Sequence, residues 1–271
     1  MMARIGLVAW HVFKESVRDR VLYGIAAFAV LLVAASLLIG QTTAGEDVKI
    51  IKDFGLATIE LAGVLMAVFV GVGLVAREID RRSIFGLLAK PLRRWEFIVG
   101  KYAGLVLTIV VNLAAMTVAL FLVLAYLHWT ALPEQRQAWD APATDARLLL
   151  VLLMMTAELA LLTAVALFFS TFSSSALMSV VFTAGVFVAG LVSTDLRRFG
   201  DIVEVSPAVA RLVSTVGWLL PGFSAFDIKA QVVHGLPVPA GFVTFTLLYA
   251  ALYIGGVIAA AVTAFSRREF V

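Results

Sequence analysis

The sequence predicts an all-α integral membrane protein with six transmembrane helices, and two properties of the chain lead to that fold class. Hydrophobic residues make up 62% of the 271 residues and charged residues only 14%, against about 25% charged in an ordinary soluble domain. Six apolar runs approach or exceed the roughly 20 residues that a helix needs to cross a hydrocarbon core of about 30 Å. We expect one transmembrane domain over residues 1–271, with an N-terminal amphipathic elbow helix, a cytosolic helix after the second span and a re-entrant outer hairpin before the last span.

Residues 1–20 predict the elbow helix, lying in the cytosolic interface of the membrane. Ile5, Val8 and Val12 recur at helical spacing, while Lys14 and its polar neighbours take the other face. The apolar run behind this segment has about 20 residues, longer than the 7–15 of a signal peptide, so the segment is not a cleavable signal. An ordinary juxtamembrane anchor is the alternative interpretation.

Runs with few or no charged residues place the six spans. The predicted ranges are 21–40, 55–76, 102–127, 148–169, 176–194 and 241–265. Thirteen Lys and Arg residues fall on the side of the N-terminus, the loop after span two and the C-terminus, against eight in the longer loops of the other side. The positive-inside rule therefore predicts that both termini are cytosolic. Arg197 and Arg198, just past span five, argue against this orientation.

The segment between spans two and three is the most informative part of the chain. Its basic residues are Arg77, Arg81, Arg82, Lys90, Arg93, Arg94 and Lys101. Apolar residues recur at roughly helical spacing from Glu78 to Leu92, and Pro91 ends the helix. We expect a cytosolic amphipathic helix over residues 77–96. An ordered helix of this kind is what a transporter driven by a separate ATPase needs.

Residues 195–240, between spans five and six, contain no full span. Their longest charge-free stretch, 212–226, has 15 residues and is interrupted by Pro221 and Gly222. That length is typical of a re-entrant or interfacial segment. Since irregular backbone at membrane depth needs protein or water around it, we expect this hairpin to pack against the bundle near its outer side.

Two carboxylates fall inside predicted spans. Glu158 lies about 16 Å from the cytosolic end of span four and Glu60 about 24 Å from that of span two, nearer the outer face. Ionisable groups within spans are costly and usually face the bundle or a water-filled cavity, so one or both are candidates to line a transport path. The alternative is structural, with a Glu hydrogen-bonded to partners such as Thr156, Thr163 or Asn112.

Several other kinds of site are excluded or unsupported by the sequence. The chain has no cysteine and three scattered histidines, so we expect no metal site. It lacks a phosphate-binding loop and any catalytic triad, so we expect no catalytic residue and no cofactor bound by this chain. Met154 and Met155 are expected to be packing residues, and Gly100 and Gly104 a close helix contact. The basic residues adjoin spans, which favours the lipid bilayer over nucleic acid.

Residues 76–101, AREIDRRSIFGLLAKPLRRWEFIVGK, resemble the most recognisable stretch of the ABC-2 type transporter permeases. The run at 170–175 and the ending SRREF at 266–270 are similar to further family features. Within the family the chain is most similar to the broad group of nitrous oxide reductase maturation permeases. The resemblance implies a half-transporter of six helices in the cytoplasmic (inner) membrane of a prokaryote. It would pair with a second copy or a paralogue and rest on two ABC ATPase subunits that bind ATP and Mg.

The resemblance also implies roles for particular residues. The ATPase-coupling positions are Arg77, Glu78, Arg81, Arg82, Ser83, Lys90, Pro91, Arg93, Arg94 and Trp95. Helices two and five usually line the path in this family, which favours Glu60 over Glu158. The Pro221–Gly222 break would match short outer helices that narrow the exit.

Three functions remain open from the sequence. The first is the permease of an ABC exporter with ATP hydrolysed elsewhere, so that the chain is not itself an enzyme. The second is an ABC-type mechanotransmitter that moves partners without carrying substrate. The third is an ion-coupled carrier or intramembrane enzyme that uses Glu158.

Overall fold

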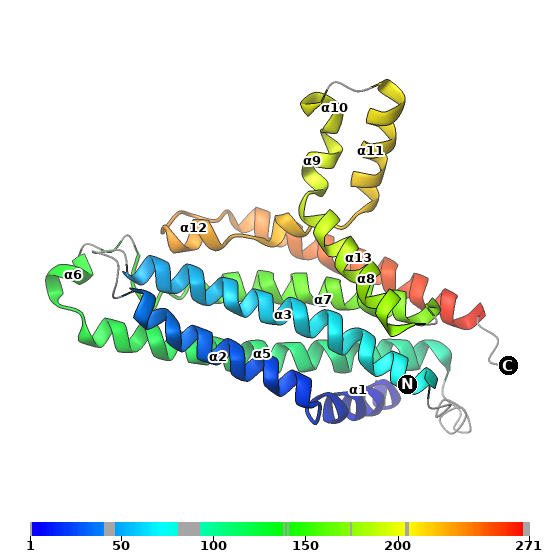
Figure 1. Cartoon of the computed structure of the whole chain (residues 1–271), viewed down its shortest axis with the longest axis horizontal. Coiled ribbons are helices and arrows are strands. Elements are labelled where there is room, and N and C mark those ends of the chain that lie inside the picture. Colours follow the sequence, from blue (N-terminus) through cyan, green and yellow to red (C-terminus); the bar gives the residue numbers. More distant parts are fainter. Residues whose placement is uncertain are drawn as a thin grey trace.

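The computed structural model describes residues 2–40, 47–80, 93–137, 139, 141–173, 175–203 and 206–267. These residues are helical throughout their regular structure and include no β-strand, which confirms the predicted all-α class. The longest helices run side by side in an elongated bundle, with α1 at one end and α6 and α12 near the other (Figure 1).

Each predicted span corresponds to a helix. These helices are α2 (Arg20–Gly40), α3 (Asp47–Asp80), α5 (Arg94–Thr130), α7 (Leu148–Phe172), α8 (Ala176–Leu191) and α13 (Ala240–Arg267). Four of them, α3, α5, α7 and α13, are long and apolar enough to cross a membrane. The apolar parts of α2 and α8 in the described chain are shorter, at 22–38 and 176–191, so the count of six crossings stays a prediction.

Between α8 and α13 the chain forms short helices instead of a span. They are α9 (Ser193–Arg197), α10 (Phe199–Ile202), α11 (Pro207–Leu219), the 3-10 helix η1 (Phe223–Phe226) and α12 (Lys229–Val233). The pair formed by 207–219 and 223–233 is bent by 46°, as in a broken span or a re-entrant loop. The break falls at Pro221 and Gly222, where proline removes a backbone donor and both residues are buried.

The core lies between α3 and α7, whose apolar side chains interdigitate along the bundle. Met66 on α3 and Leu159 and Leu162 on α7 are fully buried there. Met154 and Met155 belong to the same core cluster, which confirms that they are packing residues. Both helices are apolar on nearly all sides, as expected for central elements of a membrane bundle.

Helix α1 (Met2–Ser16) packs along α5, and two glycines permit the approach. A Cβ on Gly100 would lie 2.7 Å from Val8 Cβ, and one on Gly104 would lie 2.5 Å from the Ala9 carbonyl oxygen. Real Cβ atoms do not come this close to backbone, so only glycine fits at position 104 without a shift. The predicted close contact at these two glycines is confirmed, with α1 as the partner.

Candidate functional site

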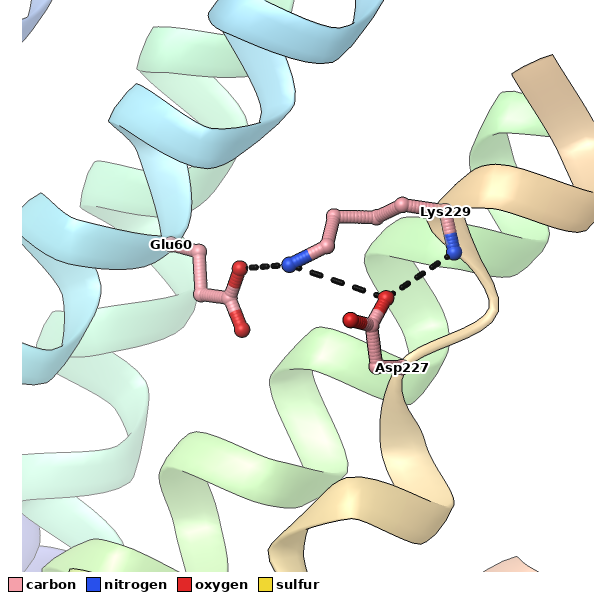
Figure 2. A network of polar contacts seen from close by, with 3 residues as sticks. All are labelled: Glu60, Asp227 and Lys229. Carbon is pink, nitrogen blue, oxygen red and sulfur yellow. Dashed lines mark hydrogen bonds and ion pairs between the residues drawn. The ribbon is translucent and has the colours of Figure 1, made fainter. Parts of the chain in front are cut away.

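An ion pair joins the segment between α8 and α13 to the middle of the bundle. The Lys229 ammonium, from the first residue of α12, donates a hydrogen bond to Glu60 Oε2 on α3 (Figure 2). The Lys229 Nζ atom also lies 3.6 Å from Asp227 Oδ1, and the Lys229 backbone N–H donates to the same oxygen at 3.1 Å. The side chains of Lys229 and Glu60 are each 19% exposed, so this pair is largely removed from solvent.

Aromatic and aliphatic side chains fix the segment that carries Lys229. Phe223 and Phe226 of η1 are buried, with the Phe223 ring centroid 5.1 Å from that of Phe187 on α8. Ile228 and Val232 are buried on either side of Lys229. This apolar packing holds the segment against the bundle and directs the Lys229 side chain toward α3.

Glu158 on α7 belongs to the same group of charges. It is 3% exposed and interacts electrostatically with Glu60, Lys229 and Asp227. The structure thus brings Glu60 and Glu158, the two carboxylates that the sequence singled out, close to the same lysine, Lys229 of α12. We name Glu60, Glu158, Asp227 and Lys229 the outer charge cluster, after the side of the bundle that the sequence predicts to be outer.

The three residues named as possible partners in the structural alternative direct their hydroxyl or amide donors elsewhere. Thr156 and Thr163 donate to the carbonyls four residues earlier in α7, and Asn112 donates to Thr108 of its own helix. Hydroxyl groups in helices commonly bond the preceding turn in this way. The opposite charge near Glu158 comes from Lys229, outside the predicted spans.

Sequence reasoning missed Asp227 and Lys229, although a signal was present. They are the only charged residues between Arg211 and Arg267. These two charged residues stand alone in a stretch of 55 residues, just after the proline-glycine break. Charged groups are costly to bury in such a segment, so partners elsewhere in the bundle are expected for them. The outer charge cluster holds three carboxylates and one ammonium, an arrangement able to attract a cationic group or to exchange partners around Lys229.

A second charged contact joins the beginning of α3 to a loop. The Lys52 ammonium donates to the Pro142 carbonyl at 2.8 Å and interacts electrostatically with Asp145 and Asp53. Arg147 in the same loop donates to the Gly235 carbonyl at 3.0 Å. The loop at 141–147 therefore connects α3 to the turn after α12.

The predicted coupling residues divide into two groups. Arg77 and Glu78 lie in the last turns of α3, while Arg93 caps α5 and Arg94 and Trp95 begin it. The remaining coupling positions, Arg81, Arg82, Ser83, Lys90 and Pro91, lie outside the described residues.

Polar contacts hold the beginning of α5. The Arg93 backbone N–H donates to Glu96 Oε2 at 3.0 Å, which caps the helix. The Arg94 guanidinium donates to the Ser266 and Phe265 carbonyls at 2.8 and 3.3 Å, at the end of α13. The end of α3 and the start of α5 thus lie at the same end of the bundle as the end of α13 (Figure 1).

The Pro221–Gly222 break packs against α8 and α13. The Gly222 backbone N–H donates to the Tyr249 hydroxyl at 2.9 Å. On α8, Gly190 faces the Pro221 carbonyl so closely that a side chain there would collide with it. The break is therefore a fixed structural feature, and its place at an exit stays a prediction.

Among the described residues no group of three or more His, Asp and Glu side chains could hold a metal ion. Each of the three histidines lies on a separate element, in α1, α5 and the end of α12.

Comparison with known proteins identifies the relationship. A family model described as ABC-2 family transporter protein matches residues 7–270. No curated protein matches the chain. The match spans nearly the whole chain and includes the outer charge cluster and the coupling segment; it does not address the nitrous oxide reductase subgroup, which stays a prediction.

Proposed function

Because the chain belongs to the ABC-2 family of transporter proteins, we propose that it is the permease subunit of an ATP-driven exporter whose ATP and Mg are bound by a separate ATPase. The working complex contains two ABC ATPase subunits and two permeases, either two copies of this chain or this chain and a paralogue. It resides in the cytoplasmic membrane of a prokaryote with both termini in the cytosol.

The continuity of α3 carries this proposal. Helix α3 runs unbroken from Asp47 to Asp80, about 50 Å at 1.5 Å per residue. Its cytosolic end enters the basic segment proposed to contact the ATPase, and Glu60 lies about 26 Å farther along. One rigid helix therefore connects the coupling segment to the outer charge cluster.

The cytosolic packing supports transmission of movement from the ATPase. Helix α5 is joined to α13 through Arg94 and to α1 through Gly100 and Gly104. A movement applied at residues 77–95 would therefore displace α3 and, together with it, the joined helices α1, α5 and α13. Since ordered elements move as units, displacement of α3 relative to α12 would separate Glu60 from Lys229 and change the outer end of the path.

Glu60 is the proposed path residue in this mechanism. Its side chain is part-buried and pairs with Lys229, whereas Glu158 is almost fully enclosed. When Glu60 and Lys229 separate, each must find a new partner, and a substrate or water could provide it. Glu60 would therefore bind Lys229 when the two residues are paired and would bind substrate or water when they are separated.

The test is co-purification of the permease with its ATPase in lipid particles. Arg81→Glu combined with Arg82→Glu should reduce ATPase recovery or uncouple hydrolysis from transport, because charge pairs that hold an interface typically contribute about 2–5 kcal/mol when buried. Lys14→Glu combined with Arg18→Glu is the matched control, since both residues are exposed near the same end of the bundle. Unchanged ATPase recovery and unchanged activity in the Arg81 and Arg82 variant would contradict the proposal.

A further inference from the structure

Residues 192–203 and 206–220, which we call the arm, stand away from the side of the bundle. Figure 1 shows α9, α10 and α11 projecting beyond α8 and α13. The arm is internally fixed: Arg197 Nε donates to the Gly217 carbonyl at 3.0 Å, and the Arg197 guanidinium lies 4.6 Å from the centre of the Trp218 ring. A Cβ on Gly217 would also contact Leu196 at 3.0 Å. Helices α9 and α11 are therefore one folded unit.

The root of the arm meets the middle of α13, a helix long and apolar enough to cross a membrane. The Tyr253 hydroxyl donates to the Leu219 carbonyl at 2.6 Å, and Tyr253 is at the centre of α13, about 20 Å from either end. Helix α8, which leads into the arm, has 16 residues and a length of about 24 Å. This is shorter than a hydrocarbon core of about 30 Å, so the chain leaves the bundle before it has crossed.

The surface of the arm does not suit a lipid environment. Asp195, Arg198, Asp201 and Arg211 are all exposed, and no ion pair joins them within the described part of the chain. Charged side chains at membrane depth face protein or water because lipid cannot solvate them. Large apolar side chains are exposed beside these charges: Val209, Leu212, Val216, Trp218 and Leu219. Apolar area with balanced charges at its margin is characteristic of a protein interface.

We propose that the arm packs against a second copy of this chain, which covers the arm's charged residues within the membrane. This inference rests on the proposed pairing of two permeases. An arm that projects from mid-depth in the membrane plane can meet only lipid or another membrane subunit, because a cytosolic or external protein does not reach that depth. Two exposed Asp and two exposed Arg side chains balance in charge, so the surface is suited to a two-fold contact in which identical surfaces meet.

The exposed side of α8 continues this surface. Only Ser179, Thr183 and Gly190 of α8 are buried in the described chain. Its exposed apolar residues include Leu177, Val181 and Val188, on the helix that leads directly to the root of the arm. A partner that covered the arm would therefore also cover α8.

Site-specific photo-crosslinking of the full complex in native membranes tests this contact. The chain has no cysteine, so Leu212→Cys provides a single site for a benzophenone probe at a side chain that is 68% exposed. Two differently tagged copies are co-expressed with the ATPase, and capture through one tag followed by detection of the other identifies products between copies. We expect the permease labelled at Leu212→Cys to shift from monomer size to dimer size after illumination. The same shift is expected for Val209→Cys, a second position on the arm.

Leu122→Cys is the matched control, because Leu122 is 66% exposed on α5, across the bundle from the arm (Figure 1). We expect it to remain at monomer size with lipid adducts. The mass of the complex in lipid particles is measured in parallel. The mass could show two permeases while the arm probes label only lipid, their own chain or a different protein. That result would overturn the arm contact and leave the proposed pairing intact. A mass with one permease would overturn both.

Discussion

Two regions of the bundle are held together by different kinds of contact. At the end near the N-terminus, α5 is joined to α1 by close approach at glycines and to α13 by hydrogen bonds from Arg94 to backbone carbonyls. Midway along α3, α12 is joined to that helix by Lys229 and Glu60, two long side chains that are each 19% exposed. Helices in close contact cannot shift slightly without collisions, whereas long charged side chains can reorient and exchange partners. We therefore expect a rigid end near the N-terminus and a contact between α3 and α12 that can separate.

Removing one partner of the outer ion pair should have the largest effect. Loss of one member of a fully buried pair costs about 3–5 kcal/mol, and partial exposure of this pair reduces that figure. Lys229→Met should therefore lower the unfolding temperature more than Glu60→Gln, because it leaves Glu60, Glu158 and Asp227 together without the lysine. Thermal unfolding of the purified complex measures this. The double variant Glu60→Gln with Lys229→Met should recover much of the loss. A double variant that loses as much as the two single variants added together would show that the pair itself matters little.

Glu60→Gln also separates a path residue from a purely structural one. The amide keeps the volume of the side chain and removes its charge. We expect basal ATP hydrolysis and expression to stay nearly unchanged while substrate-stimulated hydrolysis changes. A silent Glu60→Gln beside a Glu158→Gln that abolishes turnover would transfer the functional role to α7 and favour the ion-coupled carrier or enzyme.

Alanine at Gly104 should test the rigid end. The new methyl group would approach the Ala9 carbonyl oxygen at 2.5 Å, so α1 must shift, at a cost of about 1–3 kcal/mol. Gly24→Ala on α2 is the matched control because nothing lies within 4 Å of its added Cβ. Since alanine is favoured over glycine in a helix by about 0.5–1 kcal/mol, the control should be neutral or stabilising. Equal unfolding temperatures for the two variants would show that α1 does not need its close contact with α5.

Glu158 should tolerate an isosteric change better than truncation. Glu158→Gln keeps the volume and a hydrogen-bonding group in a site that is 3% exposed, so we expect a mild loss of stability. Glu158→Ala opens a void between α7 and its neighbours and should cost about 2 kcal/mol or more. Thermal unfolding of both variants measures the difference. Alanine that is no worse than glutamine would contradict a packing role.

The sequence predicted those features that depend on local pattern. Apolar runs located the helices, Pro221 and Gly222 located the break, and the spacing of Gly100 and Gly104 indicated a close helix contact. The Lys229–Glu60 pair was not predicted because it joins positions 169 residues apart, and helical periodicity says nothing about which face meets which element. The direction of the arm was also missed: the segment at 195–240 was expected to pack on the bundle, and its part from Pro221 to Val233 does so, yet α9 to α11 stand away (Figure 1).

The smallest expected effect concerns Arg94, which sequence resemblance assigns to ATPase coupling and which the structure joins to α13. Arg94→Met removes hydrogen bonds to the Phe265 and Ser266 carbonyls, each worth about 1 kcal/mol or less at an exposed helix end. Arg18→Met is the control, because Arg18 is an exposed arginine near the same end of the bundle and is not among the proposed coupling positions. If Arg94 only caps α13, its variant should lower the unfolding temperature slightly and leave ATPase recovery equal to that of the control. Reduced ATPase recovery in the Arg94 variant alone would show that this residue both joins the rigid end and contacts the ATPase.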